Sequence, residues 1–124
     1  MSIAAFLAVG LGGALGALCR SMATTHLKLR FRGAFPLPTL LINLAACTIA
    51  GVALCLQLQL NDVAYLALTM GFLGGFSTLS TMNYEAVELV AQHRYATGFG
   101  YLAISYASTL GAAALGFAIA SLFL

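Results

Sequence analysis

Charged side chains are missing from four long stretches of this chain, and no other feature constrains its fold as strongly. No Asp, Glu, Lys or Arg occurs at 1–19, 33–61, 63–84 or 95–124. A helix needs about 20 apolar residues to cross the hydrocarbon core of a membrane. The sequence therefore predicts an all-α membrane protein that forms one domain over residues 1–124, with transmembrane helices near 3–24, 37–58, 63–91 and 96–123.

The composition excludes most soluble classes of protein. Hydrophobic residues make up 62% of the 124 residues and charged residues only 6%, whereas a soluble domain carries about 25% charged residues. An ordinary cytosolic enzyme and a disordered segment are thereby excluded. A net charge of +2 is too small for a nucleic-acid binder. The cysteines Cys19, Cys47 and Cys55 lie scattered in apolar stretches, so neither a disulfide framework nor a zinc site is expected.

The basic residues predict the orientation of the chain. Four spans place both termini on one side of the membrane, and that side carries no Lys or Arg. The two loops on the other side contain the basic residues Lys28, Arg30, Arg32 and Arg94, and Arg20 lies toward that end of the first span. Under the positive-inside rule the loop side faces the cytoplasm and both termini lie outside.

The third span contains a sequence that weakens a helix in mid-membrane. Gly71, Gly74 and Gly75 precede a run of hydroxyl residues at 77–81, and each glycine costs a helix about 1 kcal/mol relative to alanine. We expect the backbone to unwind at these glycines. Non-helical backbone at that depth is tolerated only inside protein or along a cavity, and its freed carbonyls commonly hold a cation in transporters.

Polar side chains recur on one face of each of the last three spans. They are Thr39 and Asn43 in the second span, Thr78, Thr81, Glu85 and Glu88 in the third, where Ser80 flanks the face, and Tyr101, Ser105, Ser108 and Thr109 in the fourth. Asn43 either forms an interhelical hydrogen bond or lines a pathway, and the hydroxyls of the fourth span either bond to their own helix or share that pathway. A pathway lined by hydroxyls and one amide suits a small ion that exchanges its water for hydrogen bonds.

Small residues in the first span predict close helix contacts. Gly12 with Gly16, and Gly13 with Ala17, form pairs four residues apart that let helices approach closely in lipid. Four thin helices cannot easily enclose a pathway, so we interpret these faces as a sign of a dimer with the pathway near its interface. Arg20 either extends to the membrane surface or lines a wet vestibule.

Three segments in this order resemble the Fluc/CrcB family of fluoride channels. They are GGALGALCR at 12–20, PTLLIN at 38–43 and GFLGGFSTLSTM at 71–82. The fourth span at 101–116 is also similar to that family, with its Tyr, Ser and closing Leu-Gly.

The resemblance implies an antiparallel dual-topology dimer of four-helix subunits in the plasma membrane, with the third helix broken in mid-membrane. It implies passive export of fluoride, and hence fluoride resistance, together with a central structural Na⁺ held by the backbone carbonyls of Gly74 and Ser77. Asn43 would coordinate fluoride and Arg20 would lie in a vestibule. The polar track would consist of Ser80, Thr81 and the hydroxyl residues of the fourth span.

The chain also departs from the family pattern. Leu79 and Met82 stand where the family usually has two Phe, whose ring edges face the anion, and Pro38 replaces a glycine. The charge bias suits one fixed orientation, whereas an antiparallel dimer needs both. A heterodimer with a homologous subunit of opposite bias and an antiparallel homodimer therefore both remain as predictions.

Two other functions are compatible with a chain of this size. A small multidrug-resistance exporter needs a carboxylate in its first helix to exchange protons with cationic drugs. The first span here has no Asp or Glu, and Arg20 would repel a cation. A membrane scaffold subunit that transports nothing has no evident need for a glycine-rich break with a hydroxyl stripe.

Overall fold

The computed structural model describes residues 2–31, 33, 35–57, 59 and 61–123, apart from the side chain of Ser80, and within these ranges every regular element is a helix. Three long helices are α1 (Ile3–Arg30), α2 (Leu37–Cys55) and α6 (Tyr95–Leu122). The remaining rod consists of four pieces, which are α3 (Asp62–Leu66), the π-helix η1 (Ala67–Leu73), α4 (Gly74–Phe76) and α5 (Leu79–Ala91). The prediction of four helices long and apolar enough to cross a membrane is confirmed.

The helix ends follow from local side chains. Ser2 and Asn61 cap α1 and α3 by accepting hydrogen bonds from the backbone N–H groups of Ala5 and Ala64. Pro38 lies in the first turn of α2, where its missing N–H costs nothing. The helix α1 continues to Arg30, six residues past the end predicted at 24, because residues 25–30 contain no Gly or Pro that would end it.

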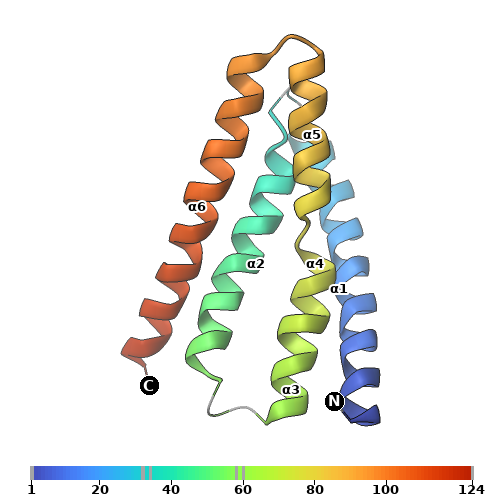
Figure 1. Ribbon diagram of the computed structural model, residues 1–124, viewed down its shortest axis with the longest axis vertical. Coiled ribbons are helices and arrows are strands. Elements are labelled where there is room, and N and C mark those ends of the chain that lie inside the picture. The colour runs from blue at the N-terminus through green and yellow to red at the C-terminus, as the bar shows by residue number, and fades with distance from the viewer. Residues whose placement is uncertain (1, 32, 34, 58, 60, 124) are drawn as a thin grey trace.

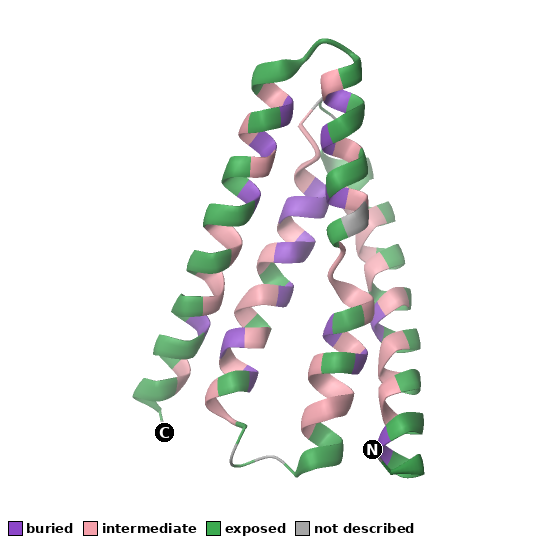
Figure 2. Cartoon of the chain, viewed as in Figure 1, coloured by how far each residue is buried: buried purple, intermediate pink, exposed green. Residues whose placement is uncertain are grey.

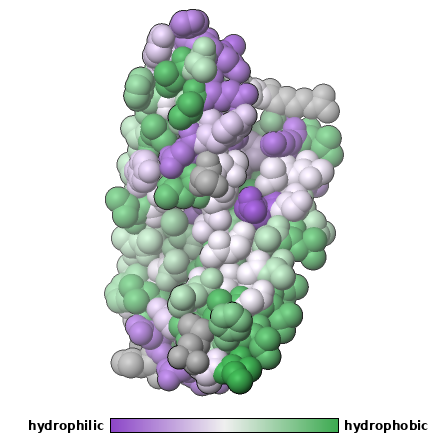
Figure 3. Space-filling model, turned by 45° about the vertical axis from the view of Figure 1, so that its right-hand side comes forward, coloured by the Kyte–Doolittle hydropathy of each residue, from purple (hydrophilic) through white to green (hydrophobic). Residues whose placement is uncertain are grey.

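The four rods run up and down beside one another (Figure 1). Both termini lie at one end, and the connections α1–α2 and α5–α6 lie at the other. Lys28 and Arg30 end α1 and Arg94 precedes α6, so these three cations share the loop end. Arg32 lies outside the described residues. Figure 3 shows polar side chains gathered at this end above a broad apolar band.

Glycines let the helices pack backbone against backbone in two pairs. The first pair joins α1 to η1 and α4, and the second joins α2 to α6. A Cβ on Gly16 would collide with the carbonyl oxygen of Phe72. In the other pair, a Cβ on Gly51 would collide with the carbonyl oxygen of Ala113. The structure therefore has no space for even a methyl group at these crossings.

The close helix contacts that we predicted for the small residues of α1 are present, and they lie within the subunit. Gly12 and Gly16 lie against the third rod of the same chain, where a Cβ on Gly12 would reach within 3.1 Å of the backbone nitrogen of Phe72. These faces are consumed by contacts inside the subunit. They therefore give no support to a dimer, although sequence spacing alone cannot separate the two uses.

The buried core lies around α2, between α5 and α6 (Figure 2). Its central residues are Leu40, Met82, Ala86 and Tyr101. The outward faces of α1 and α6 are exposed and carry large apolar side chains such as Leu11. Exposed apolar faces of this extent suit contact with lipid or with another subunit.

We predict that Gly51→Ala weakens the pairing of α2 with α6, because its methyl group meets backbone that cannot move aside. Overpacking of this kind costs about 1–3 kcal/mol, so the thermal unfolding temperature in detergent should fall. Gly10→Ala is the matched control, since a Cβ there has no neighbour within 4 Å. Equal stability of the two variants would contradict the tight crossing.

Candidate ion pathway

The third rod is interrupted at Ser77 and Thr78, where the backbone is extended. Ser77 has φ −76° and ψ 157°, and Thr78 has φ −147° and ψ 112°. The predicted location at the glycines is wrong, because Gly74 remains helical with φ −61° and ψ −37°. Gly71 and Gly75 serve close packing on α1, where a Cβ on Gly71 would lie 2.8 Å from the carbonyl oxygen of Val9. The change of direction comes one turn later.

Asn43 holds the interruption from the neighbouring helix α2. Its Nδ2 donates to the carbonyl oxygen of Thr78 at 3.0 Å, and its Oδ1 accepts from the N–H of Thr78 at 2.9 Å. One side-chain amide thus replaces both hydrogen bonds that the extended residue loses. Unpaired backbone groups cost several kcal/mol in a membrane, so this pairing stabilises the interruption. One Nδ2 hydrogen of Asn43 stays available to another acceptor.

Because of the interruption, the backbone carbonyls of Gly74 and Ser77, which we predicted as cation ligands, lose their helical hydrogen-bond donors. In a continuous helix the N–H groups of Thr78 and Thr81 would donate to the carbonyls of Gly74 and Ser77. Here the first donates to Asn43 and the second donates to Thr78 Oγ1 at 3.2 Å. Carbonyl oxygens without helical donors fit the coordination of a hard cation such as Na⁺.

Arg20 contacts the same interruption from α1. Its Nε donates to the carbonyl oxygen of Gly75 at 3.1 Å, and the residue is half-buried. A third carbonyl near the break is therefore paired with a guanidinium. Of the two roles considered for Arg20, extension to the membrane surface does not describe this contact, because the side chain turns toward the third rod.

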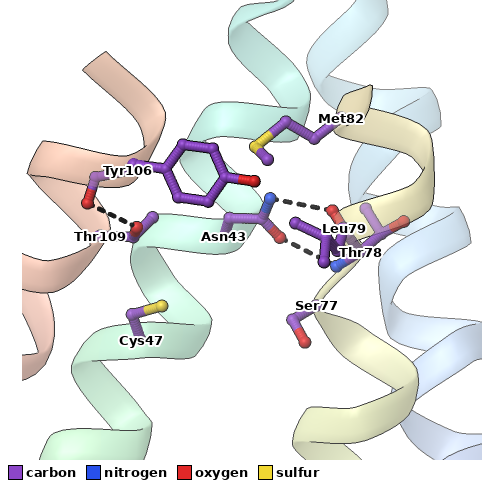
Figure 4. Close-up of a pocket in the computed structure, with 8 residues that line it drawn as sticks. All are labelled: Asn43, Cys47, Ser77, Thr78, Leu79, Met82, Tyr106 and Thr109. Carbon is purple, nitrogen blue, oxygen red and sulfur yellow. Dashed lines mark hydrogen bonds between the residues drawn. The ribbon is translucent and has the colours of Figure 1, made fainter. Parts of the chain in front are cut away.

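A cavity of about 170 Å³ lies between α2, the interruption and α6 (Figure 4). It is lined by Asn43, Cys47, Ser77, Thr78, Leu79, Met82, Tyr106 and Thr109. At about 30 Å³ per water molecule, this volume suits a small ion with part of its hydration shell. Asn43, Ser77, Leu79, Met82 and Thr109, five of the residues predicted for the pathway or the cation, thus meet at one place.

A second polar cluster lies closer to the loop end. Thr39 Oγ1 donates to Glu85 Oε1 at 2.6 Å. The hydroxyl groups of Tyr101 and Ser105 are fully buried, and neither has a hydrogen-bond partner among the described residues. A buried polar group without a partner costs about 1–3 kcal/mol. Tyr101 and Ser105 do not line the cavity at Asn43, so their hydroxyls belong to the packed core beside Thr39 and Glu85.

The remaining predicted residues contribute less to the cavity and to the second polar cluster. Ser108 Oγ donates to the carbonyl oxygen of Ile104, and Thr109 Oγ1 donates to that of Ser105 at 2.6 Å. These two hydroxyls therefore bond to their own helix, as the alternative interpretation held, although Thr109 still lines the cavity. Thr81 is half-buried next to the interruption, and the side chain of Ser80 lies outside the described part of the chain.

Tyr106 and Cys47 also line the cavity, although the hydroxyl pattern does not predict Tyr106 and the apolar surroundings of Cys47 predict only packing. The signal for Tyr106 was available, because it precedes Thr109 by three residues and therefore shares its helix face. A search restricted to hydroxyl spacing from Tyr101 and Ser105 passes over it.

Known proteins are similar to this chain over most of its length. The family model described as CrcB-like protein, Camphor Resistance (CrcB), matches residues 7–117. The fluoride-specific ion channel FluC 3 of Bifidobacterium longum (strain NCC 2705) is 43% identical over 113 residues, which cover 90% of this chain and 93% of that protein. The fluoride-specific ion channel FluC of Bordetella petrii is 42% identical over 118 residues, covering 93% and 90% of the two chains.

We predict that Asn43→Asp destabilises the protein, because a carboxylate oxygen would face the carbonyl oxygen of Thr78 in place of a donor. The loss should be about 1–3 kcal/mol, measured as thermal unfolding in detergent. Thr48→Ala is the matched control on α2, since Thr48 Oγ1 only bonds back to the carbonyl of Leu44. If both variants unfold alike, Asn43 does not hold the interruption.

Proposed function

This chain belongs to the CrcB family, and from that premise we propose that it is a subunit of a fluoride-selective ion channel. Two observations together support this proposal. Relatives matched over about nine tenths of the chain are named fluoride-specific channels. The residues that meet at the interruption place the amide of Asn43 and the hydroxyl group of Tyr106 at a small cavity. The protein would lie in the plasma membrane.

The donor groups suit a compact, strongly hydrated anion. The second Nδ2 hydrogen of Asn43 faces no acceptor of the interruption, because Thr78 uses only one. Short hydrogen bonds of this kind replace the water that fluoride leaves behind.

The direction of transport needs no pump. Hydrogen fluoride is a weak acid that crosses lipid as a neutral molecule and ionises in a near-neutral cytoplasm. A membrane potential that is negative inside contributes about 2.3 kcal/mol per 100 mV to the exit of one anion. A selective passive pathway is therefore sufficient to export the trapped fluoride.

We also propose that two subunits pair antiparallel, with a structural Na⁺ bound at the carbonyls of Gly74 and Ser77. The support comes from this chain. Gly74 is exposed, and the two carbonyls lose their helical donors. A bound Na⁺ would neutralise their partial negative charge and fix the subunits to each other.

The orientation of the partner follows from the charges. Lys28, Arg30 and Arg94 lie at one end, so that end faces the cytoplasm under the positive-inside rule. An antiparallel partner needs the opposite orientation, which a homologous subunit with reversed charge bias would supply and a second copy would supply less readily. Cysteine labelling of the termini from each side of the membrane separates the two cases.

The alternative functions have less support. A proton-coupled exporter needs a carboxylate in the first helix, and α1 contains none among its residues Ile3–Arg30. A scaffold subunit has no evident need for the cavity with its polar groups at the interruption.

We expect liposomes that contain the purified protein to lose fluoride and retain chloride when valinomycin sets a potassium potential. Asn43→Asp should slow the fluoride flux at least about tenfold, since a negative charge at the cavity raises the barrier for an anion by more than about 1.4 kcal/mol. Thr48→Ala should conduct normally. Equal loss of chloride, or no fluoride flux from the wild-type protein, would refute the channel.

Two neighbouring glycines separate a subunit contact from a contact within the chain. A Cβ on Gly74 has no neighbour within 4 Å, whereas one on Gly75 would collide with the carbonyl oxygen of Gly13. Gly74→Val should therefore leave the helices folded and shift the protein from dimer to monomer in size-exclusion chromatography. Gly75→Val should lower the unfolding temperature. An intact dimer of Gly74→Val would argue against a subunit contact there.

Ser77→Ala is the matched control for the Na⁺ site, because the proposed ligand is the backbone carbonyl. The Ser77 hydroxyl donates to the carbonyl of Leu73 at 2.8 Å within its own rod. The dimer should therefore survive its removal, and a loss of the dimer would show that the side chain matters.

A further inference from the structure

We propose that Tyr106 supplies the aromatic ring edge at the cavity, where Leu79 and Met82 offer none, and so contributes to the selection and passage of the anion. The inference rests on the proposed fluoride channel and adds a residue that determines its specificity. Among the described residues that line the cavity, Tyr106 is the sole aromatic one.

The position of the ring carries the proposal. Figure 4 shows the Tyr106 side chain leaving α6 and crossing the cavity toward Asn43 and Met82. Asn43, Leu79 and Met82 reach the same cavity from α2 and from the start of α5. The hydroxyl end of Tyr106 therefore points toward the amide of Asn43 and toward Met82 from the opposite wall, and the edge of its ring lines the cavity.

Two of the side chains that line the cavity offer no positive partial charge to an anion. An anion that sheds water at Asn43 meets a branched hydrocarbon at Leu79 and a thioether at Met82, and neither gives a positive partial charge. The edge of an aromatic ring carries such a charge, because the π electrons concentrate negative charge on its faces. A tyrosine at this place provides that edge without a fixed charge, which would hold the anion instead of passing it.

Other aromatic residues of α6 do not line this cavity. Tyr101 is fully buried and packs edge to face with Phe35 at 5.3 Å between ring centroids, so its ring is fixed in the core. Phe99 lines a different cavity beside α5. Tyr106 is half exposed, so its ring is free to approach an ion.

The test compares the fluoride flux of four proteins in liposomes, each normalised to the amount of folded protein by size-exclusion chromatography. We expect Tyr106→Leu to lower the flux about threefold to tenfold, which is the range given by one aromatic interaction. Tyr106→Phe keeps the ring edge and should stay within about twofold of wild type, well inside the scatter of such interactions. Phe99→Leu removes a ring from the same helix away from the cavity and should not change the flux.

A double variant provides an independent measurement. Adding Met82→Phe to Tyr106→Leu returns a ring to the opposite wall and should restore most of the flux, which a general loss of packing would not allow. Wild-type flux in Tyr106→Leu, or an equal loss in Tyr106→Phe, would overturn the role of the ring while leaving the channel intact. Absence of flux from the wild-type protein would instead reject the proposed function, and this inference with it.

Discussion

The pairing of one amide with one extended residue is the interaction on which the rest of this structure depends. Inside a membrane a chain cannot leave backbone N–H and C=O groups unpaired, and an extended residue in mid-helix loses both of its hydrogen bonds. Asn43 returns both to Thr78 from the adjacent helix. Because that pair satisfies the interruption, the rod can change direction there, and the cavity, the freed carbonyls and the contact with Arg20 are arranged around it.

The same pair changes the meaning of Asn43. From the sequence, Asn43 could either form an interhelical hydrogen bond or line an ion pathway. In the structure its oxygen and one amide hydrogen are committed to Thr78, while the second hydrogen is free at the cavity. The two roles therefore coexist in one side chain. The backbone holds the amide in place, and the free hydrogen is presented in a fixed direction without the entropy cost of ordering it.

Much of the fold could be predicted from where charged residues are missing, because a membrane imposes length and polarity together. The location of the interruption could not, because glycine lowers helix stability and also permits close helix contact. At Gly71 and Gly75 the contact with α1 prevails, and the helix remains intact through both. Asn43 and Thr109, which we predicted for a pathway, both line the cavity. Tyr106 was missed because its role depends on what Leu79 and Met82 fail to provide across the cavity, and this requires knowledge of which helices face each other.

The glycine crossings have a consequence for motion. Where backbone rests directly on backbone, as at Gly16 and Gly51, no side chain lies between the helices to change its rotamer and let them slide or rotate. Helix rearrangements on the microsecond to millisecond scale need such slack, whereas side-chain rotations take place within nanoseconds. A molecule with such contacts has no evident helix motion that would open and close the ion pathway in response to a signal. Such a pathway stays open, so it must exclude other ions at all times. Ion selectivity then does what gating does in other channels.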